Sequence, residues 1–201
     1  MRRILFLCAA VALLAFGLGT DGCDDSAATI DPDVVVLAAA TGATAAGDMM
    51  LVDPQTFDVA VVGLVLKAWG EATTDAAVPM KRAIEAGECK GATGSFTIDP
   101  SPYIGLPGTP TTPEEVDAAK EQVSAVLSLA LPATTGGLRT FAAMATANGD
   151  KTGCIVLTSI ADFAAPAGTL ATEILKVVEA PGDPFTFPGM SWDCSACEAV
   201  E

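Results

Sequence analysis

Two cysteines separated by two residues carry the sharpest chemical signal in the sequence. Cys194 and Cys197 form a C-x-x-C pair, and such a pair cycles between dithiol and disulfide when its first thiolate is stabilised. Thiol oxidoreductases carry this pair at the start of a helix that follows a strand, early in the domain. Here the pair lies close to the C-terminal end, and the neighbouring Asp193 disfavours a thiolate at Cys194. We therefore interpret the pair as part of a structural disulfide framework, with a redox site as the alternative.

Two more cysteines lie in the body of the chain, Cys89 and Cys154. Together with the C-terminal pair they make an even number, which predicts two disulfides in a chain that reaches an oxidising compartment. Four cysteines allow three pairings. We favour Cys89 and Cys154 each bonded to one member of the C-terminal pair, or bonded to each other while Cys194 bonds Cys197. A long-range link is expected to stabilise the fold by about 3 to 4 kcal/mol.

The commonest signatures of catalytic and metal sites are missing from the sequence. The chain has no histidine, which removes the commonest general base and the commonest ligand for zinc, copper or haem. It contains no nucleophile elbow, no Ser-x-x-Lys pattern and no phosphate-binding glycine motif. The cysteines lack the second C-x-x-C of a zinc ribbon. We therefore assign no catalytic residue, no cofactor and no metal site.

Acidic pairs are the remaining candidates for chemistry. Asp31 and Asp33, or Asp24 and Asp25, have oxygens of the kind that calcium prefers. No loop follows the EF-hand spacing, with its sixth-position glycine and its final glutamate. We interpret these acids as solvated surface charges.

The N-terminal segment has the layout of a secretory signal. Met1-Arg2-Arg3 supplies positive charge, and Ile4 to Leu18 is an uncharged apolar run. This run of about 15 residues is shorter than the roughly 20 that a membrane-spanning helix needs. We therefore expect a signal for export and no permanent transmembrane helix.

Gly22 and Cys23 end this segment, and here the N-terminus resembles the bacterial lipoprotein signal. The resemblance implies that Cys23 receives a diacylglyceryl thioether and becomes the mature N-terminus, with residues 1–22 removed. Thr20 and Asp21 stand where that pattern usually has leucine and a small uncharged residue. The alternative is an ordinary cleaved signal, which releases a secreted, soluble protein.

Residues 23–30 are expected to form an acidic tether between an acylated Cys23 and the folded body, because they are short, polar and charged. With Cys23 bound to lipid, the four remaining cysteines pair evenly. The resemblance implies a place in the bacterial cell envelope, facing the periplasm or the cell surface, and leaves the choice of membrane open.

The strong negative charge of the chain bears on its partners. The formal net charge is −15 at pH 7. The phosphate backbone of nucleic acids would repel such a surface, so we expect no nucleic-acid binding. Anionic lipids would repel it as well, which leaves an acyl chain on Cys23 as the means of membrane attachment.

The clearest start of a helix is a capping box. Thr112 supplies an N-cap hydroxyl, Pro113 suits the first helical position, and Glu115 lies at the third. Apolar residues then recur at spacings of three and four. This pattern predicts an amphipathic helix that continues up to Pro132.

Two Asp-Pro pairs indicate helices in the first half of the chain. Asp31-Pro32 is expected to open one over residues 34–46, although Val34 to Leu37 is equally typical of a buried strand. Asp53-Pro54 is expected to open a second, whose apolar stripe extends from Phe57 to Trp69.

Prolines mark two further candidate helices, and glycine and proline mark the loops. Pro79 is expected to begin a short helix that Gly87 closes, and Pro166 is expected to begin another. Residues 91–111 and 181–193 are predicted to be long Gly/Pro-rich loops.

Residues 138–163 allow two interpretations. Asn148-Gly149-Asp150-Lys151 is a strong turn signal that follows an alanine-rich, helix-like segment. The next segment, Cys154 to Thr158, has strand composition. We favour a helix, a turn and a further helix, and the alternative is a hairpin around residues 140–160.

Together these features predict a mostly α protein: a compact, bundle-like helical domain over residues 31–201, with long Gly/Pro-rich loops and disulfides. An α+β fold with the small hairpin is the alternative. For function we expect a non-enzymatic binding, structural or assembly component of the cell envelope. Two alternatives stay open: a thiol-disulfide oxidoreductase that uses the C-x-x-C, and a carrier of an apolar ligand. The carrier rests on the apolar runs at residues 34–40 and 60–66, and the sequence identifies no protein partner.

Overall fold

The computed structural model describes residues 31–93, 96–164, 173–175, 184–187 and 189–197. The signal segment 1–22 and the tether 23–30 lie outside the described residues, so the expectations for both stay predictions.

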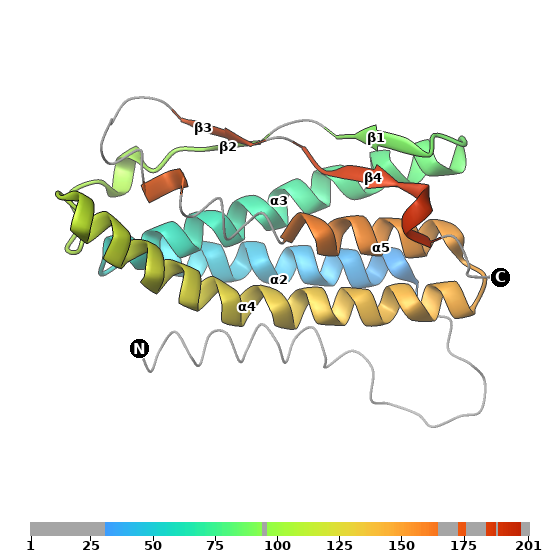
Figure 1. Cartoon of the computed structure of the whole chain (residues 1–201), viewed down its shortest axis with the longest axis horizontal. Helices are drawn as coiled ribbons and strands as arrows, with labels where there is room; N and C mark the ends of the chain where they lie inside the picture. The colour runs from blue at the N-terminus through green and yellow to red at the C-terminus, as the bar shows by residue number, and fades with distance from the viewer. Residues whose placement is uncertain (1–30, 94–95, 165–172, 176–183, 188, 198–201) are drawn as a thin grey trace, which may run out of the picture.

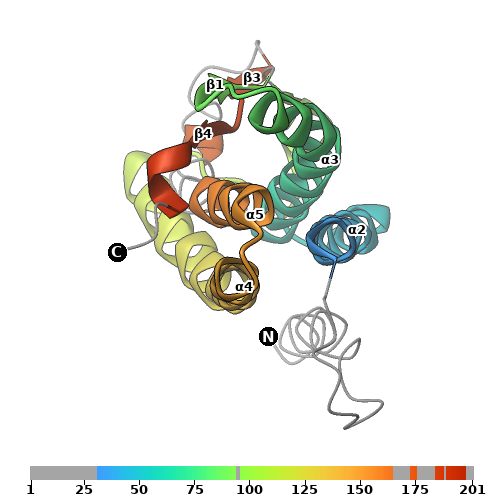
Figure 2. The ribbon, with the colours of Figure 1, turned by 90° about the vertical axis from the view of Figure 1, so that its right-hand side faces the viewer.

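Four long helices lie side by side and make up most of the described chain (Figure 1). They are α2 (Pro32–Val52), α3 (Phe57–Glu85), α4 (Pro113–Ala147) and α5 (Lys151–Ala164). Seen from one end, α5 lies between α3 and α4, and α2 lies at the edge of the bundle next to α3 (Figure 2). The prediction of a mostly α, bundle-like fold is confirmed.

The segment that suited either a helix or a buried strand is helix α2. Asp31 is its N-cap, and one carboxylate oxygen accepts a hydrogen bond from the Asp33 backbone N–H at 3.0 Å. Pro32 occupies the first turn, where its missing N–H leaves no bond unmade. Local capping thus decides between two structures that the apolar pattern leaves open.

Helix α3 differs from the prediction at its start, near Pro54, and at Pro79. It begins after Thr56, and Asp53 is instead the C-cap of α2. Pro79 lies inside α3, so the prediction that a separate helix begins there is wrong. An interior proline costs about 3 kcal/mol. Burial of apolar side chains on both sides of Pro79 offsets this cost, because Met80 and the first half of the helix face the core.

Helices α2 and α3 pack at very short range through glycines. A Cβ atom added at Gly47 would lie 2.6 Å from the Gly63 carbonyl oxygen and 2.6 Å from the Lys67 backbone nitrogen. A Cβ atom at Gly70 would meet the Thr44 hydroxyl and backbone. Only glycine lets the two backbones approach this closely.

Helix α4 begins as predicted and ends later than predicted. The capping box is complete: the Thr112 hydroxyl accepts from the Glu115 backbone N–H, and the Glu115 carboxylate accepts from the Thr112 backbone N–H at 3.2 Å. The helix continues through Pro132 to Ala147, so the prediction that it ends at this proline is wrong. Burial of Leu127 before Pro132 and of Leu138 after it favours one continuous helix where local propensity favours a break.

The turn at residues 148–150 connects α4 to α5. Gly149 adopts a φ of 77°, a left-handed conformation that glycine reaches without strain. The Asp150 carboxylate accepts from the Gly153 backbone N–H at 2.8 Å and so caps the first turn of α5. Helix, turn and helix is confirmed here, and the hairpin around 140–160 is wrong.

The segments predicted as long loops contain four short strands, which form two antiparallel pairs along one side of the bundle (Figure 1). They are β1 (Lys90–Ala92), β2 (Phe96–Ile98), β3 (Phe185–Phe187) and β4 (Ser191–Asp193). Strand β1 pairs with β4 across about a hundred residues of sequence, and β2 pairs with β3 across about ninety. Short 3-10 turns, η1 (Ser101–Tyr103) and η2 (Cys194–Cys197), complete these segments.

One apolar core connects all four helices. Most of the predicted stripe of α3 is buried: Phe57, Val61, Val65 and Trp69 are no more than 2% exposed, whereas Leu64 is half-buried. Residues 166–172, where another helix is expected to begin, lie outside the described residues. Ile174 and Leu175 beyond them are helical and fully buried.

Candidate functional site

The four cysteines of the folded body form two long-range disulfides. Cys89 bonds Cys194 with their Cα atoms 4.9 Å apart, and Cys154 bonds Cys197 with their Cα atoms 6.1 Å apart. Each C-x-x-C cysteine therefore takes a different partner, as in the first expectation, and the alternative in which Cys194 bonds Cys197 is wrong. The geometry therefore uses the C-x-x-C to attach the end of the described chain to both α5 and the segment after α3.

Strand β4 reinforces the first of these bonds. The Cys194 backbone N–H donates to the Cys89 carbonyl at 3.0 Å, and the Trp192 indole N–H donates to the Glu88 carbonyl at 3.0 Å. The Trp192 ring lies directly over Gly91, where no larger residue would fit. Trp192 thus anchors this segment to the end of α3 and to β1.

Asp193 adds a hydrogen bond and an ion pair in the same region. Its carboxylate accepts from the Ser195 backbone N–H at 2.9 Å and pairs with the Lys90 ammonium at 3.2 Å. The hydrogen bonds from Ser195, together with Lys90, lower the pKa of Asp193 to about 2. Its charge serves the local turn.

A cleft with a volume of about 370 Å³ opens where α2 and α5 begin and α4 ends. These helix ends lie together at the right of Figure 1. The cleft is lined by Asp31, Pro32, Val35, Lys81, Phe141, Met144, Ala145, Asn148, Asp150 and Leu157. Six of these side chains are apolar, and the charged ones come from a cap of α2, a cap of α5 and the last turns of α3.

The two acids that suggested calcium take other roles at the cleft. Asp31 caps α2, and Asp33 pairs with the Lys81 ammonium at 2.5 Å. This hydrogen bond is the main cause that raises the pKa of Lys81, so the ammonium stays charged. Asp24 and Asp25 lie outside the described residues. Within the described ranges no cluster of three or more His, Cys, Asp or Glu side chains could hold a metal ion.

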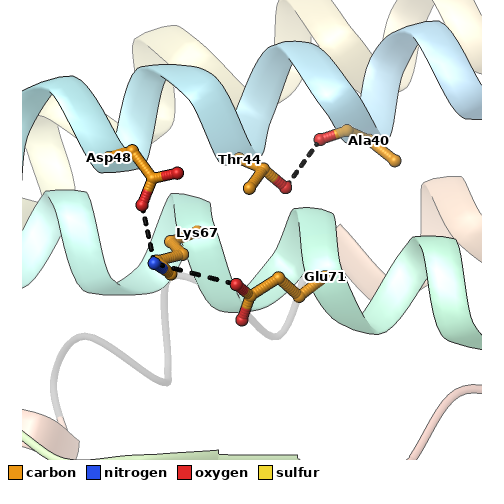
Figure 3. A network of polar contacts seen from close by, with 5 residues as sticks. All are labelled: Ala40, Thr44, Asp48, Lys67 and Glu71. Carbon is orange, nitrogen blue, oxygen red and sulfur yellow. Dashed lines mark hydrogen bonds and ion pairs between the residues drawn. The ribbon is translucent and has the colours of Figure 1, made fainter.

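A cluster of charged side chains lies halfway along α2 and α3, where it links the two helices. The Lys67 ammonium donates to Asp48 at 2.6 Å and lies 3.8 Å from Glu71, beside the Thr44 hydroxyl that bonds the Ala40 carbonyl (Figure 3). The hydrogen bond to Asp48 raises the pKa of Lys67. All of these side chains border the close α2–α3 contact.

Helix α2 exposes much of its outer surface. Val34, Leu37, Met49 and Val52 are 54 to 84% exposed, at helical spacing. By length and composition, α2 is also the helix of the described chain that is apolar enough to cross a membrane. Its opposite face is buried in the bundle, chiefly against α3.

Among the site residues predicted from the sequence, Cys89, Cys154, Cys194 and Cys197 lie close together and are bonded in pairs. Cys23 lies outside the described residues. The structure also brings together a cleft that sequence reasoning missed. The sequence does indicate that Asp31 and Asp150 lie at the starts of helices, where they serve as caps. Their proximity follows only from the packing of α2 against α4 and α5.

Comparisons with known proteins add no relative. No protein-family model, no curated protein and no solved structure matches this chain.

Proposed function

We propose that this chain is an exported lipoprotein, held to a bacterial membrane by a lipid on Cys23, that acts as a non-enzymatic binding, structural or assembly component of the cell envelope. The observation that carries the proposal is the apolar signal segment that ends at Gly22-Cys23. An ordinary secreted protein is the alternative for the same segment.

The disulfide framework supports this proposal. Disulfides form and persist in oxidising compartments such as the periplasm and are rare in the cytosol. Cys89, Cys154, Cys194 and Cys197 are all engaged in the two bonds. After residue 22 this leaves Cys23 as the one cysteine outside them, available to accept a lipid.

The pairing also supports a structural role for the C-x-x-C. A redox-active pair works by forming a bond between its own two sulfurs. Here Cys194 and Cys197 each hold a distant part of the chain. This arrangement favours the binding or structural component over the oxidoreductase.

The anchor is tested by labelling the full chain with a fatty-acid analogue in a bacterial host. Wild-type protein and the Cys8→Ser variant should both carry label, remain with the membrane fraction and show an intact mass that fits cleavage before Cys23 plus lipid. The Cys23→Ser variant should carry none. Unlabelled wild-type protein in the soluble fraction would overturn the anchor and favour the secreted alternative.

A second candidate function, carriage of an apolar ligand, is favoured by the cleft. Its interior surface is contributed by Val35, Phe141, Ala145 and Leu157, of which the last two are buried. A concave site with apolar walls and a few polar groups is the usual form of a small-molecule site.

A further inference from the structure

The cleft combines an apolar interior with an acidic rim. Val35, Phe141, Ala145 and Leu157 line it, and the Met144 side chain is 42% exposed beside it. Asp31 and Asp150 bring carboxylates to the same cavity from two different helix starts. A molecule that fills this cleft therefore meets apolar side chains and negative charge together.

The two rim carboxylates are held in place by the backbone. Asp31 accepts from the Asp33 N–H and Asp150 accepts from the Gly153 N–H, in each case through one oxygen. A carboxylate has acceptor sites for several hydrogen bonds, so capping does not exhaust it. Fixed acceptors of this kind bind a cationic donor without first having to be ordered.

The cation in the lining, Lys81, offsets the negative charge of this rim only in part. The Lys81 ammonium is bonded to Asp33 at 2.5 Å. Glu85 and Asp31 also lie near enough to act on Lys81 electrostatically. The lining thus presents two carboxylates, and its one ammonium is already paired with a third.

The size of the cavity limits the ligand. A volume of about 370 Å³ lies near the lower end of the range of small-molecule sites. One ring or one short alkyl chain fits such a space, whereas a complete phospholipid does not.

From these features we infer that the cleft binds a small amphipathic amine, with its apolar body against Phe141 and Leu157 and its ammonium between Asp31 and Asp150. The inference deepens the proposed function and rests on it, because an acylated Cys23 would hold the cleft near a membrane. The eight residues from Asp24 to Asp31 span at most about 30 Å.

The test compares three probes of equal chain length that differ in the head group: hexylamine, hexanol and hexanoate. Each is titrated by calorimetry into the full chain carrying Cys23→Ser, which has no acyl chain to interfere. The protein is exported to an oxidising compartment so that both disulfides form. Hexylamine should bind with saturation in roughly the millimolar range and about tenfold more tightly than hexanol. Hexanoate should bind most weakly.

Two variants remove the charge and retain the caps, because Asn is as good an N-cap as Asp. Asp31→Asn and Asp150→Asn should each weaken hexylamine binding by about tenfold and leave hexanol binding unchanged. Asp53→Asn is the matched control, since it removes an acid at the other end of α2 and should change neither.

Equal affinity for the three probes, or no saturable binding of hexylamine by a folded protein, would overturn the inference. Folding of each variant is checked by its helical circular dichroism. Acylation is measured separately on wild-type protein, so failure of amine binding and failure of the anchor give different results.

Discussion

At the scale of single residues, two buried polar atoms on α3 stand out. Within the described chain, Trp69 Nε1 and Thr73 Oγ1 have no hydrogen-bond partner, although Trp69 is 2% exposed and Thr73 is 0% exposed. They lie one helical turn apart. A buried polar group that makes no hydrogen bond costs about 1–3 kcal/mol. The hydroxyl of Thr73 is therefore a cost to stability.

Thr73→Val replaces this hydroxyl with a methyl group of similar shape. We expect the free energy of unfolding to rise by about 1 kcal/mol, because the buried donor is removed and the packing is kept. Thr74→Val is the matched control: its hydroxyl donates to the Gly70 carbonyl at 3.0 Å and its side chain is exposed, so no gain is expected. Urea denaturation measures both, and a loss of stability in Thr73→Val would show that the hydroxyl is bonded.

Residue-level predictions from sequence succeeded where the chemistry is local. The Thr112 to Glu115 capping box needs only four consecutive residues, and all of its bonds are present. The sequence predicted two disulfides but left all three pairings of the four cysteines open. Which sulfur meets Cys89 depends on how β1 pairs with β4, and sequence spacing does not contain that information.

At the scale of elements, the α2–α3 contact determines how closely the first two helices pack. The atoms that a Cβ at Gly47 would meet include backbone of the neighbouring helix, which cannot rotate away as a flexible side chain can. Gly42, on the same helix, has no atom within 4 Å of its Cβ position. The two glycines therefore form a matched pair.

Gly47→Ala should lower the free energy of unfolding by about 1–3 kcal/mol, because the helices must separate to admit the methyl group. Gly42→Ala should raise it by about 0.5–1 kcal/mol, because alanine favours a helix and meets open space. Thermal unfolding followed by circular dichroism compares them. Equal effects of the two substitutions would contradict the close contact.

Prolines caused the main errors at this scale. Pro79 and Pro132 were expected to begin and to end helices, and both lie inside one. Propensity describes what a segment prefers alone, whereas burial along 29 and 35 residues of helix decides the outcome here. The Asp31-Pro32 start was correct because capping and packing agree there.

At the scale of the whole molecule, the two disulfides fasten its last described segment to the bundle. They connect residues 105 and 43 positions apart in sequence. Links over such distances reduce the entropy of the unfolded chain, which stabilises the folded state by about 5 kcal/mol for the first disulfide and about 4 kcal/mol for the second. Each is a large fraction of the net stability of a typical domain, which is about 5–15 kcal/mol.

Replacing Cys89 and Cys194 together by alanine should therefore lower the free energy of unfolding by several kcal/mol, as should replacing Cys154 and Cys197. The Cys8→Ser variant is the control and should be neutral. Peptide mapping without reductant identifies which pair remains in each variant. If Cys194 and Cys197 were found bonded to each other in wild-type protein, the framework would be wrong.

The class of fold was readable from composition and periodicity, while the cleft was not. Its lining comes from four helices, and only the tertiary arrangement brings Asp31 within one cavity with Phe141 and Asp150. The strands were missed for a related reason. A strand of three residues in a Gly/Pro-rich segment is too short to show an alternating hydrophobic pattern. The strand that it pairs with lies about ninety to about a hundred residues away in sequence.

The order of the cysteines along the chain also has a consequence in time. If the chain enters an oxidising compartment N-terminus first, Cys89 and Cys154 arrive before Cys194 and Cys197, so an oxidation at that stage can join them only to each other or to another early cysteine. Cys194 and Cys197 arrive last and next to one another. Through thiol-disulfide exchange they can then resolve such a bond and take one partner each. The late C-x-x-C thus makes correct assembly of the whole bundle depend on the final part of the described chain.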